Sequence, residues 1–187
     1  NRPYTELVYQ PMLELLSYLR ANGFKTFIVS GGGIEFMRPW TERVYGVPPE
    51  QVIGSSLRKE LRREHGRATL WRTPEVQTLN DKEGKPTNID LHIGRRPIFA
   101  AGNVRSGGDI AMLDYTRDPA RPSFQLLVHH DDGAREFAYE ERDDASLTAA
   151  RAGGWTVVSM KRDWATIFDD GRGRRRHGVS EQADDLR

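Results

Sequence analysis

The chain is predicted to be an α/β protein built on a mostly parallel β-sheet. Short apolar runs alternate along it with longer segments of helical periodicity. The runs are nearly continuous instead of alternating with polar residues, which is typical of strands covered on both faces. Strands and helices that alternate at this spacing favour parallel strands joined by helices. We expect strands at residues 24–29, 97–101, 123–130 and 155–160.

The first half of the chain gives the clearest helical signals. An apolar stripe of helical spacing runs from Val8 to Leu19, and Asn22-Gly23 is a typical helix C-cap. After the strand Phe24–Val29, a second helix is expected over Ile34–Tyr45, interrupted or bent near Pro39.

The pattern of apolar and polar residues changes between residues 51 and 73. Two half-polar segments flank a turn at His65-Gly66, which predicts a small β-hairpin inserted beside the main sheet. Further helices are expected before Gly94 and over Ile110–Tyr115. The hairpin is also the most basic region inside the fold. It is either a solvated ribbon or an arm that attracts an anionic substrate.

Composition narrows the class of protein. Of the 187 residues, 37% are apolar and 29% are charged, which is ordinary for a globular domain. The formal net charge of +1 does not indicate nucleic acid or a membrane as a partner. There is no cysteine, which excludes thiolate chemistry and leaves both the bacterial cytoplasm and the periplasm open. Oligomeric state is not indicated by any pattern.

The domain organisation is simple. Residues 1–170 are expected to form one α/β core, and residues 171–187, rich in Gly, Arg and Asp, a flexible tail. The chain begins at Asn1 in a sequence that reads as the interior of a protein, so we expect a C-terminal fragment.

The stretch FKTFIVSGGGIEFM ends an apolar strand in Ser30 and three glycines. A hydroxyl and the amides of Gly31 and Gly32 at a helix start suit the oxygens of a phosphate group. The alternative is a tight strand-to-helix turn with Ser30 as the N-cap.

Two charged residues are candidates for the same site. Lys85, in DKEGKP, lies at a helix entrance, where a cation is unfavourable unless an anion is near. Asp109 follows the strand that ends near Asn103 and suits Mg²⁺, which prefers oxygen ligands. The alternatives are a solvated surface lysine and an ordinary N-cap aspartate.

The order Ser, Lys, Asp along the chain, and stretches such as GVPPEQVIGSS, DKEGKP, LLVHHDD and GWTVVSMK, resemble the haloacid dehalogenase-like hydrolase superfamily. More narrowly, they resemble its phosphoserine-phosphatase-like bacterial members, over almost all of residues 3–168. The resemblance implies a Rossmann-like domain with helices on both faces of the sheet. It also implies a phosphatase that acts through an aspartyl-phosphate.

The resemblance also implies roles for particular residues. Ser30 and Gly31 would bind phosphoryl oxygens, and Lys85 would stabilise the charge of the transition state. Asn103 and Asp109 would hold Mg²⁺, although they lie six residues apart instead of the usual four.

The family's first motif, an Asp-x-Asp pair that supplies the nucleophile, is absent, because the first aspartate is Asp81. We therefore expect the central first strand and most of the cap to be missing, and the chain to be inactive and poorly stable alone. The rival interpretations are a non-catalytic module that binds phosphate or nucleotide, and an interaction domain whose arginine-rich tail meets an acidic partner.

Adjacent histidines at 129 and 130 suggest a metal site at first sight. Because neighbouring residues of a strand point to opposite faces, we expect instead a strand end capped by Asp131 and Asp132.

Overall fold

Two three-stranded sheets organise the chain in the computed structural model, which describes residues 3–105 and 107–169. The first sheet is mixed, because β1 runs parallel to β2 and β2 runs antiparallel to β3. The second sheet has the order β4-β5-β6 and is entirely parallel. The strands are β1 (Ile28–Gly33), β2 (Val52–Glu64), β3 (Arg67–Thr78), β4 (Phe99–Asn103), β5 (Phe124–His129) and β6 (Thr156–Ser159).

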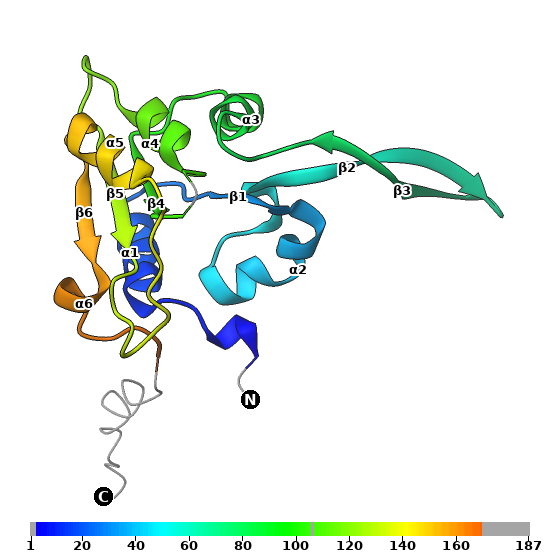
Figure 1. Cartoon of the computed structure of the whole chain (residues 1–187). Helices are drawn as coiled ribbons and strands as arrows, with labels where there is room; N and C mark the ends of the chain where they lie inside the picture. Colours follow the sequence, from blue (N-terminus) through cyan, green and yellow to red (C-terminus); the bar gives the residue numbers. More distant parts are fainter. Residues whose placement is uncertain (1–2, 106, 170–187) are drawn as a thin grey trace, which may run out of the picture.

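Helices connect these strands, so the predicted α/β class is confirmed (Figure 1). The prediction of a single, mostly parallel sheet is not, because the described strands form two sheets. Pro39 lies inside the second α-helix without ending it. The helices are α1 (Gln10–Ala21), α2 (Ile34–Tyr45), α3 (Gly84–Ile93), α4 (Ile110–Thr116), α5 (Ala145–Gly153) and α6 (Met160–Asp163), with short 3₁₀ turns at Tyr4–Glu6 and Pro49–Gln51.

The strand expected over Phe24–Val29 is shifted along the chain. In the structure it runs over Ile28–Gly33, so the glycines extend the strand and are not a turn after it. The reason is the partner: β2 pairs with β1 from the Ile28–Val52 register onward. Residues 24–27 have no strand beside them in the described part of the chain, and apolar composition alone does not make a strand without a partner.

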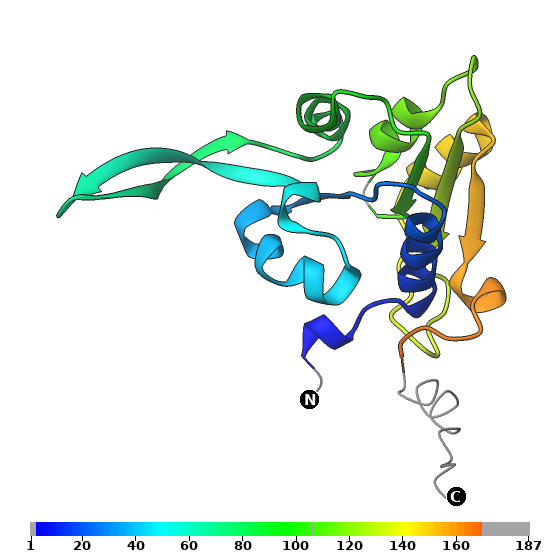
Figure 2. The same ribbon diagram turned by 180° about the vertical axis from the view of Figure 1, so that it is seen from behind.

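The predicted hairpin is present but longer and placed differently. It extends to Thr78, with the turn at His65 and Gly66, which both have positive φ as a two-residue type I′ turn requires. Its first strand belongs to the sheet, because it pairs with β1 before it runs out into solvent. Figures 1 and 2 show β2 and β3 projecting far from the rest of the molecule.

Helices cover both faces of the second sheet and of the inner part of the first, but not the projecting hairpin (Figure 1). Leu127 of β5 packs in the cluster that includes residues of α4 and α5, whereas its neighbour Val128 packs on the opposite face beside Met12 of α1. In the first sheet, Val52 packs with residues of α2. Ile53 faces the other way and joins Ile89 of α3 in the cluster of Leu127. One core therefore links the two sheets through α3.

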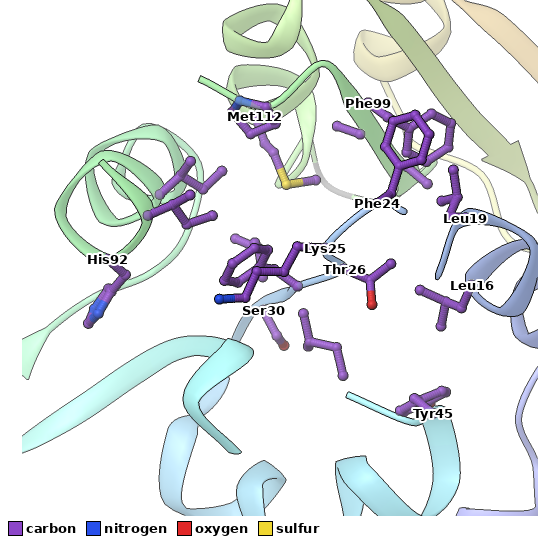
Figure 3. A pocket seen from close by; sticks show the side chains of 18 of the residues that line it. Leu16, Leu19, Phe24, Lys25, Thr26, Ser30, Tyr45, His92, Phe99 and Met112 are labelled. Atoms are coloured by element: carbon purple, nitrogen blue, oxygen red, sulfur yellow. The ribbon is translucent and has the colours of Figure 1, made fainter. Parts of the chain in front are cut away.

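A large cavity separates the two sheets. Its volume is about 1110 Å³, and β1 and β4 both line it, as do α1 and α3. Figure 3 shows Leu16 and Leu19 of α1 on one side of it and His92 at the end of α3 on the other. The edges of β1 and β4 that border this cavity carry no neighbouring strand among the described residues.

In the described part of the chain, no helix has the length and apolarity needed to cross a membrane. The predicted flexible tail, residues 171–187, lies outside the described residues.

Candidate functional site

Lys85 and Asp109 form the centre of the candidate site. The Lys85 ammonium donates a hydrogen bond to Oδ1 of Asp109, and the two side chains are 8% and 15% exposed. Lys85 is the second residue of α3, where the sequence placed it. Because the helix N-terminus repels a cation, the carboxylate of Asp109 is the group that makes this position favourable for lysine. The interpretation of Lys85 as a solvated surface residue is therefore wrong.

Asp109 does not act as a helix cap. It occupies the N-cap position of α4, but in the described part of the chain its side chain accepts no bond from the amides of that helix. Its second oxygen, Oδ2, accepts a hydrogen bond of 3.0 Å from the backbone amide of Asn103. Both oxygens thus tie the start of α4 to α3 and to the end of β4.

Close backbone contact fixes this arrangement. A Cβ placed on Gly102 would lie 2.6 Å from the Cβ of Asp109 and 2.9 Å from its Oδ2. Glycine is therefore needed at position 102 for the Asp109 side chain to lie against β4. Asn103, the second predicted metal ligand, ends β4 beside it, and its side chain lies 3.5 Å from the hydroxyl of Tyr139.

Ser30 lies in the adjoining part of the molecule. It is inside β1 and is not a helix N-cap, since Gly33 takes that position for α2. Its hydroxyl accepts a hydrogen bond of 3.1 Å from the amide of Gly32 and borders the large cavity, as Figure 3 shows. Among the described residues, the hydroxyl makes no hydrogen bond to Lys85 or Asp109.

Asn80, which sequence reasoning missed, joins the two parts of the site. It is fully buried, and its side-chain amide donates to the carbonyl oxygen of Ser30 at 2.8 Å. Its Oδ1 accepts from Asn88 of α3 at 3.1 Å, so the residue connects the end of β1 to the helix that carries Lys85. The only signal in the sequence was a pair of asparagines eight residues apart around DKEGKP.

Asp81 was also missed, and it lies between the two glycine-rich segments. A Cβ on Gly31 would lie 3.8 Å from Oδ1 of Asp81, and a Cβ on Gly108 would lie 3.1 Å from the same oxygen. The end of β1 and the loop before Asp109 therefore approach one carboxylate group. This brings the Ser30 segment and the Asp109 segment to the same region.

The residues expected to bind Mg²⁺ do not form a metal site by themselves. The ion prefers several oxygen ligands, but the Asp109 oxygens are occupied by an ammonium and an amide N–H, both of which compete with a cation. Among the described residues, no group of three or more His, Asp or Glu side chains is arranged to hold a metal.

The two histidines at the end of β5 have separate surroundings. His130 is buried, stacks on Tyr139 with ring centroids 4.2 Å apart, and lies 3.6 Å from Glu136 Oε2. Burial lowers the pKa of His130, and the nearby Glu136 opposes this effect only in part. Burial also raises the pKa of Tyr139.

The following acids form the strand-end caps that the sequence predicted. Asp131 accepts hydrogen bonds from the hydroxyl of Ser159 at 2.5 Å and from the amide of Lys161 at 3.0 Å. Asp132 accepts from the amides of Ala134 and Arg135, both at 3.2 Å.

Comparison with known proteins adds no family to this description. No protein-family model matches the chain, and no curated protein matches it.

Proposed function

We propose that this chain is the greater part of a phosphomonoester hydrolase of the haloacid dehalogenase-like type. The observation that carries the proposal is the buried Lys85–Asp109 pair beside the glycine-rich end of β1. A lysine held at a helix N-terminus next to backbone amides is suited to an anion such as a phosphoryl group. The chain order Ser30, Lys85, Asp109 is that of the superfamily it resembles.

In this proposal each residue has a defined task. The Ser30 hydroxyl accepts from the Gly32 amide and donates its own proton to a phosphoryl oxygen beside the amide of Gly31. Lys85 offsets the negative charge that develops during transfer. Asp109 orients the Lys85 ammonium. Mg²⁺ dependence belongs to the proposal, with Asp109 and Asn103 beside the nucleophile as the residues that would hold the ion.

The cavity between the sheets supports a Rossmann-like sheet with an absent central strand. It is bordered by Ile28 and Val29 of β1 and by Phe99 and Ala100 of β4, and these two strands have open edges. An apolar strand placed here would satisfy the unpaired amides and carbonyls of both edges. Its carboxyl end would emerge near Ser30 and Asn103.

An aspartate at that position would be the nucleophile. Its carboxylate oxygen would attack phosphorus and displace the alcohol of the phosphomonoester, which leaves with a proton. Water would then cleave the aspartyl-phosphate and release inorganic phosphate, restoring the carboxylate.

The test is hydrolysis of p-nitrophenyl phosphate by the product of the complete reading frame, with and without Mg²⁺. We expect activity that Ser30→Ala and Lys85→Ala each lower by at least about 100-fold. The matched controls are Ser17→Ala and Lys161→Ala, which alter exposed side chains away from the site. Equal activity in all four variants would contradict the roles assigned to Ser30 and Lys85.

A second candidate is a module that binds a phosphorylated ligand without turnover. The observation in its favour is that Lys85 and Asn103 already occupy the carboxylate of Asp109. Calorimetric binding of a phosphomonoester that is lost in Lys85→Ala, without phosphate release by the complete protein, would favour this candidate over the hydrolase.

A further inference from the structure

The outer part of the β2–β3 hairpin, residues 59–72, forms an arm that leaves the body of the molecule. Almost every residue of the arm is exposed on both faces of the ribbon. Leu61 and Leu70 pair across it and are 53% and 68% exposed. An isolated two-stranded ribbon is only marginally stable in water, and large apolar side chains exposed on it favour contact with a partner.

The two faces of the arm differ in charge. Directly paired residues of antiparallel strands share a face, so Lys59, Arg72, Leu61, Leu70 and Arg63 lie together. This face, which we call the Leu61 face, carries three cations and no acid, a charge of +3.

The opposite face is balanced, because Glu60 and Glu64 offset Arg62 and Arg67. Some of its side chains also contact one another. The Arg62 guanidinium lies 4.6 Å from the ring centroid of Trp71, and the Trp71 indole donates to Thr69 at 3.1 Å.

The Leu61 face is only partly paired within its own chain. Lys59 pairs with Glu35 of α2 at 2.7 Å. Arg63 and Arg72, however, have no carboxylate within 4.0 Å among the described residues. The face therefore fits a partner that presents an apolar side chain between carboxylates.

The same chain carries such a surface elsewhere. The loop Glu136–Asp144, between β5 and α5, contains five acids and one arginine, a net charge of −4 from five negative charges and one positive charge. Phe137 in this loop is 84% exposed. Glu140 and Asp143 are exposed beside it, whereas Glu141 is engaged with Ser146.

The arm cannot reach this loop in its own molecule. Figures 1 and 2 both show the arm running out on one side of the body and the segment between β5 and α5 on the other. We propose that the Leu61 face docks onto the Glu136–Asp144 loop of a second copy of this chain. Each copy carries both surfaces, so two copies close into a pair with two such contacts, or more copies close into a ring.

The contact rests on observations independent of the proposed phosphatase function. Exchange of the charges tests it directly. One variant carries Arg63→Glu and Arg72→Glu, and the other carries Glu140→Lys and Asp143→Lys. The mass of each is measured by analytical ultracentrifugation over a range of protein concentrations, and circular dichroism verifies that each is folded.

We expect the unmodified chain to self-associate and each variant alone to dissociate at least about tenfold more readily. The first variant places acids opposite the acidic loop, and the second removes the net negative charge of that loop. An equimolar mixture of the two variants restores both contacts, and it should form a mixed oligomer. The matched control is Arg62→Glu with Arg67→Glu on the opposite face, which should leave association unchanged.

Several outcomes would overturn the proposal. These are a monomeric unmodified chain, association that survives both exchanges, and a mixture that fails to associate although both variants are folded. Phe137→Ser is a second test that does not depend on charge. Loss of association in this variant would support the proposal, and unchanged association would contradict it. Binding of the arm to nucleic acid or to another acidic protein by a chain that stays monomeric would assign the Leu61 face to a different partner.

Discussion

At the scale of single residues, Lys85 and Asp109 illustrate how a buried charge depends on its partner. An ammonium and a carboxylate are each costly to remove from water, and the cost is offset only when they meet. The Asn103 amide satisfies the remaining oxygen of Asp109. The pair is therefore stable as a unit, and each half alone would be destabilising.

Replacement of one partner should show this effect. We expect Lys85→Met to lower the free energy of unfolding by about 3 kcal/mol, because it leaves Asp109 as an unpaired buried charge. The double variant Lys85→Met with Asp109→Leu should recover most of this loss. Urea unfolding measures both, with the exposed Lys161→Met as the control. A double variant as unstable as the single one would contradict the role of the pair.

Gly102 provides a steric test of the same site. A methyl group there would overlap the Asp109 side chain, so Gly102→Ala should cost about 1–3 kcal/mol by overpacking. Gly133→Ala is the matched control, because its Cβ would lie 3.5 Å from the nearest atom, an ordinary contact. Thermal unfolding of the two variants should differ clearly, and equal melting temperatures would mean that Asp109 does not lie against β4.

His130 should make stability depend on pH. Its pKa in the folded chain is lowered from the usual 6.5, chiefly by burial. The unfolded chain therefore takes up a proton that the folded chain does not, and stability falls as the pH drops below 6.5. The carboxylate of Glu136 opposes this lowering of the pKa, whereas the charges of His129 and Arg105 add to it.

The measurement is the melting temperature at about pH 7.5 and about pH 5.5, on either side of the usual histidine pKa. We expect a decrease on acidification that His130→Phe reduces, because phenylalanine can stack on Tyr139 without titrating. Exposed His92→Gln should retain the decrease. An unchanged pH profile in His130→Phe would exclude His130 as its source.

The candidate site could be predicted only in part from the sequence. Lys85 was found because a lysine is unusual at the start of a helix. Asp109 was found because an aspartate after a strand, at the start of a helix, is a typical oxygen ligand for Mg²⁺. Asn80 and Asp81 were missed because their importance comes from contacts with residues about 50 and 30 positions away. A buried amide that joins the carbonyl group of Ser30 to the side chain of Asn88 has no local pattern in the sequence.

At the scale of elements, strand limits depend on partners that the sequence does not reveal. The apolar run Phe24–Val29 predicted a strand, yet pairing with β2 moves the strand onto Gly31–Gly33. The hairpin was easier to predict, since its turn at His65-Gly66 is encoded locally. Its length and its membership of the β1 sheet depend on non-local pairing, and both differed from the prediction.

The arm should contribute little to the stability of the chain. Lys59 and Arg72 are directly paired, so a two-residue Asn-Gly turn can replace residues 60–71 between them. We expect the free energy of unfolding to change by less than about 1 kcal/mol, because the removed side chains are exposed. By contrast, Ile53→Ala at the buried base of the same hairpin should cost about 2–5 kcal/mol. A large loss from the deletion, measured by urea unfolding, would place the arm in the folded core.

At the scale of the whole molecule, the two sheets share a core but no strand pair. Ile53 and Ile89 pack with Leu127, so the halves are held together by side chains across α3. Beside this contact, the cavity of about 1110 Å³ leaves the edges of β1 and β4 open. Unpaired backbone groups at such edges lower stability by about 1–3 kcal/mol for each group that water does not satisfy.

Hydrogen exchange can detect these open edges. Strand β5 has neighbours on both sides, whereas β4 has only one among the described strands. We expect the amides of Leu127 and Val128 to exchange most slowly, near the rate set by global unfolding. The β4 amides that face the cavity should exchange much faster, through local opening.

An added central strand would change this pattern in a specific way. In the product of the complete reading frame, the amides of β1 and β4 should become as protected as those of β5, because β1 and β4 then each have a neighbouring strand on both sides. The β6 edge serves as the internal control, since its neighbours are unchanged. Protection of β4 that is already complete in the 187-residue chain would contradict an acceptor edge at the cavity, and with it the position proposed for the nucleophile.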